Sequence, residues 1–475
     1  MNNHIKYIAN SLSIMILVLW GCNTPQFSTK ANKIDLPLNY NESTIDTSKL
    51  INWKSYFDDQ NLISLIDTAL KNNQELNILL QEIAISKNEV QIRKSEYLPF
   101  VNIIANADAD KVARYTRNGA LEHNLQIKPG EEFPEPLKNF QIEANSSWEI
   151  DIWKKLRNAK KSAMMKYLAS IEAKNFMISN LVSEIASTYY ELIALDNTLE
   201  IIEKNIEIQD NALETIKAQK SSALVTQLAV NRFEAQLLNT RNKQYKIKQS
   251  IIEKENLLNY LTARFPSKLF RSKIDLSQFN LPDLAYGLPS QLLENRPDIK
   301  KAEYDLIAAD LNLKSAKANF YPRLSINATT GFQAFNSNLL FMPESMLFNL
   351  GSELITPVIN RNAIKAVYST AKAQQLQAIY NYNQTVINAF VEVRNQISNI
   401  ENLNNSIKLK ADEVTILYNS IDISNGLFNS ARADYMEVLL TQREALDAKL
   451  ELLEIKTNQI HSFISLYRTL GGGWN

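Results

Sequence analysis

The sequence has few of the residue types on which enzymes and disulfide-rich domains depend. Its 475 residues include one cysteine, Cys22, which excludes internal disulfides and CxxC redox or metal sites. The three histidines, His4, His123 and His461, are far apart in the chain and form neither an HExxH motif nor the pattern of a His-based triad. We therefore expect a protein that is not an enzyme and that carries no cofactor and no resident metal.

The sequence also contains few glycines and has no net charge. Only 10 glycines occur, three of them at 471–473, which leaves little material for phosphate-binding loops and suits long uninterrupted helices. The 51 basic residues balance the 51 acidic ones, so no net field attracts nucleic acid. After residue 22 no stretch is apolar enough for a transmembrane helix, so a membrane span would have to be built from strands.

The first 22 residues have the pattern of an export signal. Residues 1–6 are short and polar, and residues 8–19 form a mainly apolar run that is shorter than the about 20 residues a spanning helix needs. The run ends in Leu-Trp-Gly-Cys, which resembles a bacterial lipobox and predicts that Cys22 is the lipidated first residue of the mature protein. The alternative is an ordinary signal peptide with an incidental cysteine. Residues 23–52 are polar and predict an extended tether.

Four short stretches alternate apolar and polar residues with the period of a strand: 101–110, 140–152, 323–333 and 346–356. In 140–152 one face carries Phe140, Ile142, Trp148 and other apolar residues, and the opposite face is polar and acidic. Across the four stretches the acidic residues on the polar faces are Asp108, Asp110, Glu143, Glu149, Asp151 and Glu353. We expect these six residues to line a wet surface, either as a solvated wall or as the mildly cation-favouring lining of a lumen.

Helical patterns fill most of the remaining chain, and their order repeats. Helix, proline, strand, loop, strand, long helix, break and helix occur once before residue 264 and once after residue 294, which indicates an internal duplication. The expected segments are a signal peptide (1–21), a tether (22–52), a first repeat (53–264), a linker (265–293), a second repeat (294–470) and a tail (471–475).

Strands of this length and alternation fit either a membrane wall or a soluble sheet that covers a helical core. About ten residues suffice for a tilted strand to cross hydrocarbon, with one face toward lipid and the other toward water. Four strands cannot close a barrel, since about eight is the smallest number that does. If the strands span a membrane, several copies of the chain must share one barrel, because hydrocarbon admits no open sheet edge.

The chain resembles the TolC-like outer-membrane factor family, specifically its lipid-anchored efflux branch. The resemblance lies in the tandem organisation and in five segments: WEIDIWKKLRNA (148–159), LPSQLLENRPDIKKAE (288–303), ANFYPRLSI (318–326), TPVINRNAIKAVYSTAKAQQLQAIYNYNQTVINAFVEV (356–393) and SLYRTLGGGW (465–474). It implies a mainly α fold with a membrane β-barrel: a homotrimer in the bacterial outer membrane with twelve strands, four from each chain, and a long periplasmic α-helical barrel.

The function that this resemblance implies is passive export. The channel is expected to serve as the exit for drugs, toxic compounds or ions that an inner-membrane pump of the RND type delivers through a periplasmic adaptor protein. Two alternatives stay open: a conduit for type I protein secretion, and a lipid-anchored periplasmic scaffold without a pore.

By the same resemblance, the tips of the two helical hairpins are functional. Residues Arg432, Asp434, Tyr435 and Glu437 match the coils that close the periplasmic end of the tunnel, although a solvated helix end is the alternative. Ala223 and Ala431 stand at the tip turns, where relatives usually have glycine and where the adaptor is expected to dock. Lys154, at the first joint between strand and helix, also replaces a usual glycine.

Overall fold

The computed structural model describes residues 37, 40, 52–277, 279, 289–358, 361–430 and 432–474. The signal peptide, Cys22, most of the tether and Ala431 lie outside the described residues. The chain divides into two compact units, whose boundaries fall inside long helices. The sheet unit contains residues 84–167 and 304–379, and the helical unit contains residues 33–83, 168–303 and 380–475.

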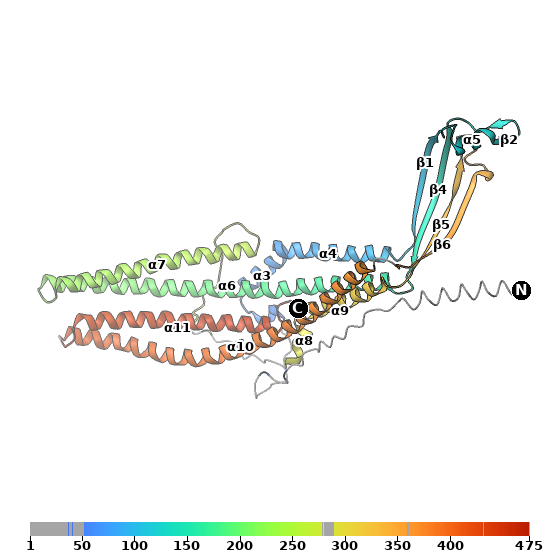
Figure 1. Ribbon diagram of the computed structural model, residues 1–475. Coiled ribbons are helices and arrows are strands. Elements are labelled where there is room, and N and C mark those ends of the chain that lie inside the picture. Colours follow the sequence, from blue (N-terminus) through green and yellow to red (C-terminus); the bar gives the residue numbers. More distant parts are fainter. Residues whose placement is uncertain are drawn as a thin grey trace. The chain divides into compact units, whose positions relative to one another are not determined.

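The sheet unit is built on one antiparallel sheet in the order β1-β4-β5-β6 (Figure 1). Its strands are β1 (Phe100–Asp110), β4 (Leu137–Ile150), β5 (Arg323–Ala334) and β6 (Met346–Ile355). All four correspond to predicted strands, but β4 begins and ends earlier than 140–152. The β1–β4 connection contains a helix, α5 (Arg117–Asn124), and a small hairpin, β2 (Gln126–Lys128) and β3 (Glu131–Glu132), where the sequence suggested only a loop. The β5–β6 connection holds two short turns, η2 (Ser337–Leu339) and η3 (Pro343–Ser345).

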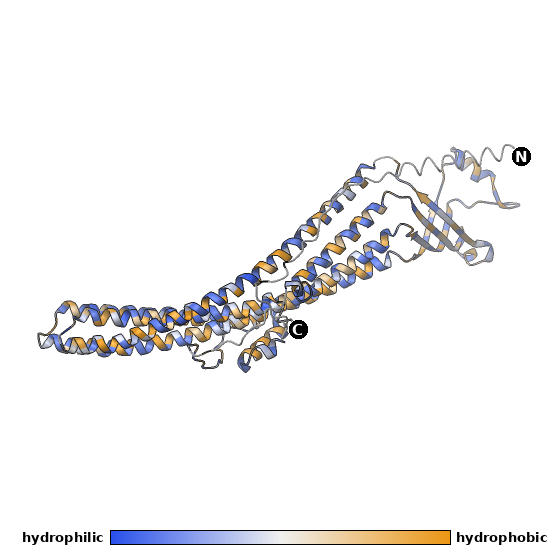
Figure 2. Cartoon of the chain, turned by 90° about the horizontal axis from the view of Figure 1, so that it is seen from below, coloured by the Kyte–Doolittle hydropathy of each residue, from blue (hydrophilic) through white to orange (hydrophobic). Residues whose placement is uncertain are grey.

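The strand register keeps residues of one kind on one face. Ile142 of β4 lies opposite Ala105 of β1 and opposite Phe332 of β5, and Phe332 in turn pairs with Met346 of β6. The next residue along β4, Glu143, belongs to the other face. Because a slip of one residue would exchange the two faces of a strand, the alternation read from the sequence fixes this register. Figure 2 shows the alternation as changing colours along the strands.

Long helices make up most of the chain. They are α4 (Gln74–Ser95), α6 (Lys155–Ser221), α7 (Gln227–Leu261), α9 (Pro297–Ala318), α10 (Asn362–Asn429) and α11 (Tyr435–Thr469). The helical segment before the first strand is divided into α3 (Gln60–Asn72) and α4. Asn73 causes the break, because its backbone is extended, its Oδ1 accepts a bond from the Leu76 amide and its Nδ2 donates to the carbonyl of Leu261.

The core of the helical unit joins segments that are distant in the sequence. Buried residues of α2 (Trp53–Tyr56) and α3 pack with the middle of α6, with linker residues Leu269 and Leu276, and with the end of α11. Residues near 53–70, the linker and the end of the last helix therefore share one buried cluster. The end of the linker and the first residues of the second repeat form η1 (Pro289–Gln291) and α8 (Leu292–Asn295). None of the helices in the described part of the chain combines the length and the apolar character that crossing a bilayer requires.

Candidate functional site

Within the part of the chain that the structure describes, the two outer strands of the sheet are exposed and the two inner strands are mostly half-buried. Every residue of β1 is exposed, and nearly every residue of β6. On the apolar face, Ile103 and Phe348 are each 81% exposed and Leu350 is 76% exposed. The outer edges of β1 and β6 have no paired strand among the described residues. A continuous apolar surface of this kind marks contact with a membrane or with another protein.

The polar face is organised by hydrogen bonds between neighbouring side chains. The carboxylate of Glu143 accepts from Gln141 Nε2 and from Asn145 Nδ2, and Asn145 Oδ1 accepts from the hydroxyl of Thr329 on the next strand. The predicted residues Asp108, Asp110, Glu143, Glu149 and Glu353 lie on the strands that were expected to carry them. Whether they line a lumen stays a prediction.

Glu149 differs from the other acidic residues of this face because cations surround it. Its carboxylate oxygens lie 3.6 Å from Lys155 Nζ and 3.9 Å from Arg323 Nη1. The pair of cations offsets much of its charge, so the acidic character of the face rests on the remaining carboxylates.

The prediction for Asp151 was wrong. This residue was assigned to the wet face of the strand, but β4 ends at Ile150 and the side chain of Asp151 is only 1% exposed. Its carboxylate accepts from the backbone amides of Leu156 (3.1 Å) and Arg157 (2.9 Å) and from Arg157 Nε (3.2 Å). Asp151 therefore caps the start of α6 and satisfies two of the amides that a helix start leaves unpaired. A strand pattern that runs straight into a helix hides such a cap.

Two positions that the family resemblance would expect to hold glycine adopt a glycine-like backbone. Lys154, between β4 and α6, has φ +60°, and Ala223, in the turn between α6 and α7, has φ +59°. Residues with a Cβ rarely occupy this left-handed region, because the side chain approaches the backbone carbonyl. The turns therefore keep the geometry that glycine would allow, at a cost in stability.

At the tips of the hairpins, α6, α7, α10 and α11 share a small apolar cluster. It contains Phe233 and Leu237 of α7, and Phe428, Tyr435 and Leu439 pack against it from the second hairpin. Of the predicted gate residues, Tyr435 thus holds the hairpins together, while Arg432, Asp434 and Glu437 are exposed. Arg232, which the sequence analysis missed, reaches the sulfur of Met436 across the same junction.

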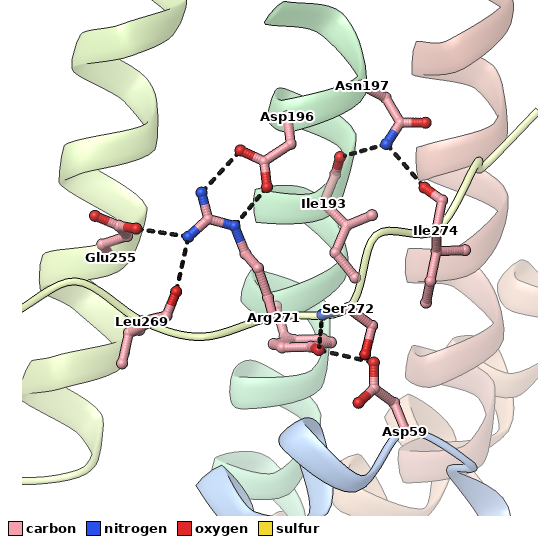
Figure 3. A network of polar contacts seen from close by, with 10 residues as sticks. Asp59, Ile193, Asp196, Asn197, Glu255, Leu269, Arg271, Ser272 and Ile274 are labelled. Atoms are coloured by element: carbon pink, nitrogen blue, oxygen red, sulfur yellow. Dashed lines mark hydrogen bonds and ion pairs between the residues drawn. The ribbon is translucent and has the colours of Figure 1, made fainter. Parts of the chain in front are cut away.

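The linker is fixed to α6 and α7 by a partly buried arginine (Figure 3). Arg271 donates to both carboxylate oxygens of Asp196 on α6 and to Glu255 on α7, with its side chain 13% exposed. These hydrogen bonds hold the pKa of the Arg271 guanidinium above its usual range, led by the bond to Asp196. A lone arginine in a linker gives no signal of this role in the sequence.

A second set of bonds continues along the same linker. The hydroxyl of Tyr189 donates to Asp59 and accepts from the backbone amide of Ser272, and Asn197 Nδ2 donates to the carbonyl of Ile274. Burial is the main cause that raises the pKa of Tyr189 to about 12, so the phenol stays a donor at physiological pH. Within the described residues no group of three or more histidine, cysteine or acidic side chains is arranged to hold a metal ion.

Comparison with known proteins identifies the type of molecule to which this arrangement corresponds. Residues 65–264 and 288–472 match the outer membrane efflux protein family, once for each repeat. The sequence is 25% identical over 465 residues to the cation efflux system protein CusC of Escherichia coli O6:H1, covering 96% of this chain and 97% of that protein. It is also 25% identical over 454 residues to the probable outer membrane lipoprotein SilC of Salmonella typhimurium, covering 94% and 92%.

The fold has counterparts among solved structures. The open state of the Neisseria gonorrhoeae MtrE outer membrane channel superposes with a TM-score of 0.81 at 20% identity, covering 95% of this chain and 98% of that one. The fold class expected from the sequence, a helical barrel with a strand domain and a duplicated chain, is thereby confirmed.

Proposed function

The chain belongs to the outer membrane efflux protein family, and we propose that three copies of it close one channel. Proteins of this family are outer-membrane channels of tripartite efflux systems, and they transport without performing catalysis. This protein is therefore an outer-membrane efflux channel, as the sequence predicted. The trimer, the type of pump, the cargo and the roles of individual residues are the proposed part.

We infer the trimer from the exposed face and the unpaired edges of the sheet. Its apolar face is exposed, its two edge strands β1 and β6 are unpaired in the described part of the chain, and four strands are too few to enclose a lumen. In hydrocarbon each unpaired edge would leave a row of amides and carbonyls without partners. Pairing β1 of one copy with β6 of the next removes every edge, and three copies supply twelve strands.

Partners and anchor follow from the family resemblance. The hairpin tips at Ala223 and Ala431 are the proposed docking surface for a periplasmic adaptor, which joins the channel to an inner-membrane pump of the RND type. Cys22, outside the described residues, is the proposed lipid anchor. The similarity to a protein named as an outer membrane lipoprotein supports this assignment.

The proposed path for cargo runs along the polar strand face and through the hairpin tips. Asp108, Asp110, Glu143, Glu149 and Glu353 would line the upper part, and Arg432, Asp434, Tyr435 and Glu437 would surround the periplasmic opening. The proposed cargo is small molecules or ions, and the pump selects among them.

The trimer is tested by cross-linking the detergent-extracted protein and measuring its mass, for the wild type and for Cys22→Ser. We expect a species of three chains in both, and we expect Cys22→Ser to stay in the outer membrane because its strands still span. A single chain released into buffer after Cys22→Ser would contradict the channel and favour the tethered scaffold.

A further inference from the structure

The sheet unit carries an uneven distribution of charge that the net charge of the chain conceals. Where the four helices meet the strands, segments 93–99, 151–161, 314–323 and 361–365 contain twelve basic residues but only two acidic ones, Glu96 and Asp151. Over the whole sequence the two kinds are equal in number. We call these twelve residues the basic belt: Arg93, Lys94, Lys154, Lys155, Arg157, Lys160, Lys161, Lys314, Lys317, Arg323, Arg361 and Lys365.

Part of the basic belt lies where the fold itself disfavours positive charge. Helices α6 and α10 begin at the sheet, and neither has an acidic residue in its first turn. Instead Lys154, Lys155 and Arg157 surround the start of α6, and Arg361 and Lys365 surround the start of α10. The positive end of a helix dipole repels cations, so the dipoles of α6 and α10 do not stabilise positive charge at these positions. Such a local conflict is expected where a sequence serves binding rather than stability.

Some of the cations near the start of α6 form ion pairs and others do not. Lys155 lines a cavity of about 460 Å³ together with Glu149 and Arg323, and it pairs with Glu149. Lys154, in the turn before α6, and Lys161, in its second turn, are both exposed. In the described part of the chain, Lys154, Lys160 and Lys161 form no ion pair, although Arg93, Arg157 and Lys314 each do.

Aromatic residues lie beside the basic belt at the same strand ends. The rings of Trp153 and Tyr321 stack with centroids 4.6 Å apart, and Trp153 Nε1 donates to the carbonyl of Pro322. Trp148 Nε1 donates to the carbonyl of Tyr97. Tryptophan and tyrosine collect at the level of lipid headgroups, where a ring meets both an apolar and a wet environment.

We propose that the basic belt, through Lys154, Lys160 and Lys161, binds the phosphate headgroups of anionic phospholipids in the periplasmic leaflet of the outer membrane. Clusters of lysine and arginine next to a membrane span attract anionic lipid, and each nearby cation adds to the attraction. The proposal rests on the outer-membrane location of the family and not on the number of chains in the channel. It gives the junction between strands and helices a specific lipid contact that fixes its depth in the membrane.

The test uses the full-length protein in detergent, titrated with phosphatidylglycerol or phosphatidylcholine, with bound lipid counted by native mass spectrometry. The variant is Lys154→Gln/Lys160→Gln/Lys161→Gln. The matched control is Lys71→Gln/Lys246→Gln/Lys408→Gln, which changes the net charge equally with exposed lysines of the helical unit. We expect the wild type to prefer phosphatidylglycerol and the first variant to bind it at least tenfold more weakly, while the control stays within twofold of the wild type.

Three outcomes overturn the proposal. The first is equal phosphatidylglycerol binding by the wild type and the first variant. The second is a loss of phosphatidylglycerol binding in the control that equals the loss in the first variant. The third is displacement of the lipid by inorganic phosphate at the same concentration, which indicates a site for free anions. Should the first variant not fold, a salt series on the wild type decides, because the preference must fall as ionic strength rises. Cross-linking of the same samples reports separately on the trimer, so either proposal can fail while the other stands.

Discussion

Arg296 donates from Nη1 to the backbone carbonyl of Thr469 over 3.0 Å, which joins the start of the second repeat to the end of the last helix. Its guanidinium is 4% exposed and also binds Asp298 through Nε and Nη2 and Glu392 through Nη1. The adjoining residue, Asn295, lies so close to Gly471 that a Cβ there would stand 2.6 Å from the Asn295 carbonyl oxygen. The two segments that helix periodicity does not demand, 288–303 and 465–474, therefore lie against each other.

Replacing Arg296 should be among the most destabilising single changes in the helical unit. Arg296→Ala leaves Asp298, Glu392 and the Thr469 carbonyl without their shared donor, and breaking a buried pair in this way costs about 3–5 kcal/mol. Arg296→Lys should recover little, since an ammonium cannot reproduce the planar fork that faces several acceptors. Thermal unfolding in detergent, followed by circular dichroism, measures the effect.

Arg241→Ala is the matched control for this prediction. Arg241 also binds both oxygens of a carboxylate, Asp210, but both side chains are nearly half exposed. Exposed pairs contribute about 0–1 kcal/mol, so the midpoint should hardly change. Equal effects of the two substitutions would show that burial of Arg296 does not matter.

The sequence predicts the strands and the repeat because local patterns determine both. Alternation defines the two faces of β4 and β5, and Pro99 and Pro322 mark the joints where helices end. The break at Asn73 and the cap formed by Asp151 were missed, since each depends on where one polar side chain points after folding. Arg271 binds Asp196 at a separation of 75 positions, and Arg296 binds Glu392 and Thr469 at separations of 96 and 173, which no periodic pattern records.

Ala223→Gly should stabilise the turn between α6 and α7. Ala223 has φ +59°, a conformation that costs a residue with a Cβ about 1–2 kcal/mol and costs glycine almost nothing. Glycine also gives the unfolded chain more conformational freedom, which lowers the stability of the folded chain by about 0.4–1 kcal/mol. We therefore expect a net stabilisation of about 0.5–1 kcal/mol. The control Ala235→Gly, at an exposed site within α7, should instead destabilise by about 1 kcal/mol. A loss at both sites would contradict the strain at Ala223.

Asp151→Ala should weaken the joint between β4 and α6. The substitution removes the acceptor for the Leu156 and Arg157 amides and for the Arg157 side chain, at a cost of about 2 kcal/mol. Hydrogen exchange should rise first in residues 155–158. Asp108→Ala, at an exposed position of β1, is the control and should leave that exchange unchanged. If residues 155–158 exchange at the same rate in both variants, Asp151 does not cap the helix.

Stability should fall in mild acid through His461. Burial lowers the pKa of His461, which outweighs the raising effects of Glu191 and of the Ser187 carbonyl, and its Nε2 has no hydrogen-bond partner within the described residues. The unfolded chain, with its ordinary pKa near 6.5, therefore binds the proton more readily than the folded chain, and stability is lost as the pH falls below that value. Unfolding midpoints at pH 7.5, 6.5 and 5.5 measure this, and His461→Gln should reduce the slope. An unchanged slope in the variant would assign the acid sensitivity to other groups.

Glu437 provides the most direct test of the proposed periplasmic gate. Its side chain is exposed in the first turn of α11, three residues after the N-cap residue Asp434, and three chains would place three such carboxylates around one opening. A ring of carboxylates focuses a negative potential that concentrates cations, so Glu437→Ala should weaken block of the channel by divalent cations by roughly tenfold. Single-channel recordings in planar bilayers measure the block. Glu454→Ala, an exposed acid on a different face of the same helix, is the control and should behave as the wild type. If Glu437→Ala and the wild type show the same block, the carboxylate at position 437 does not face the opening.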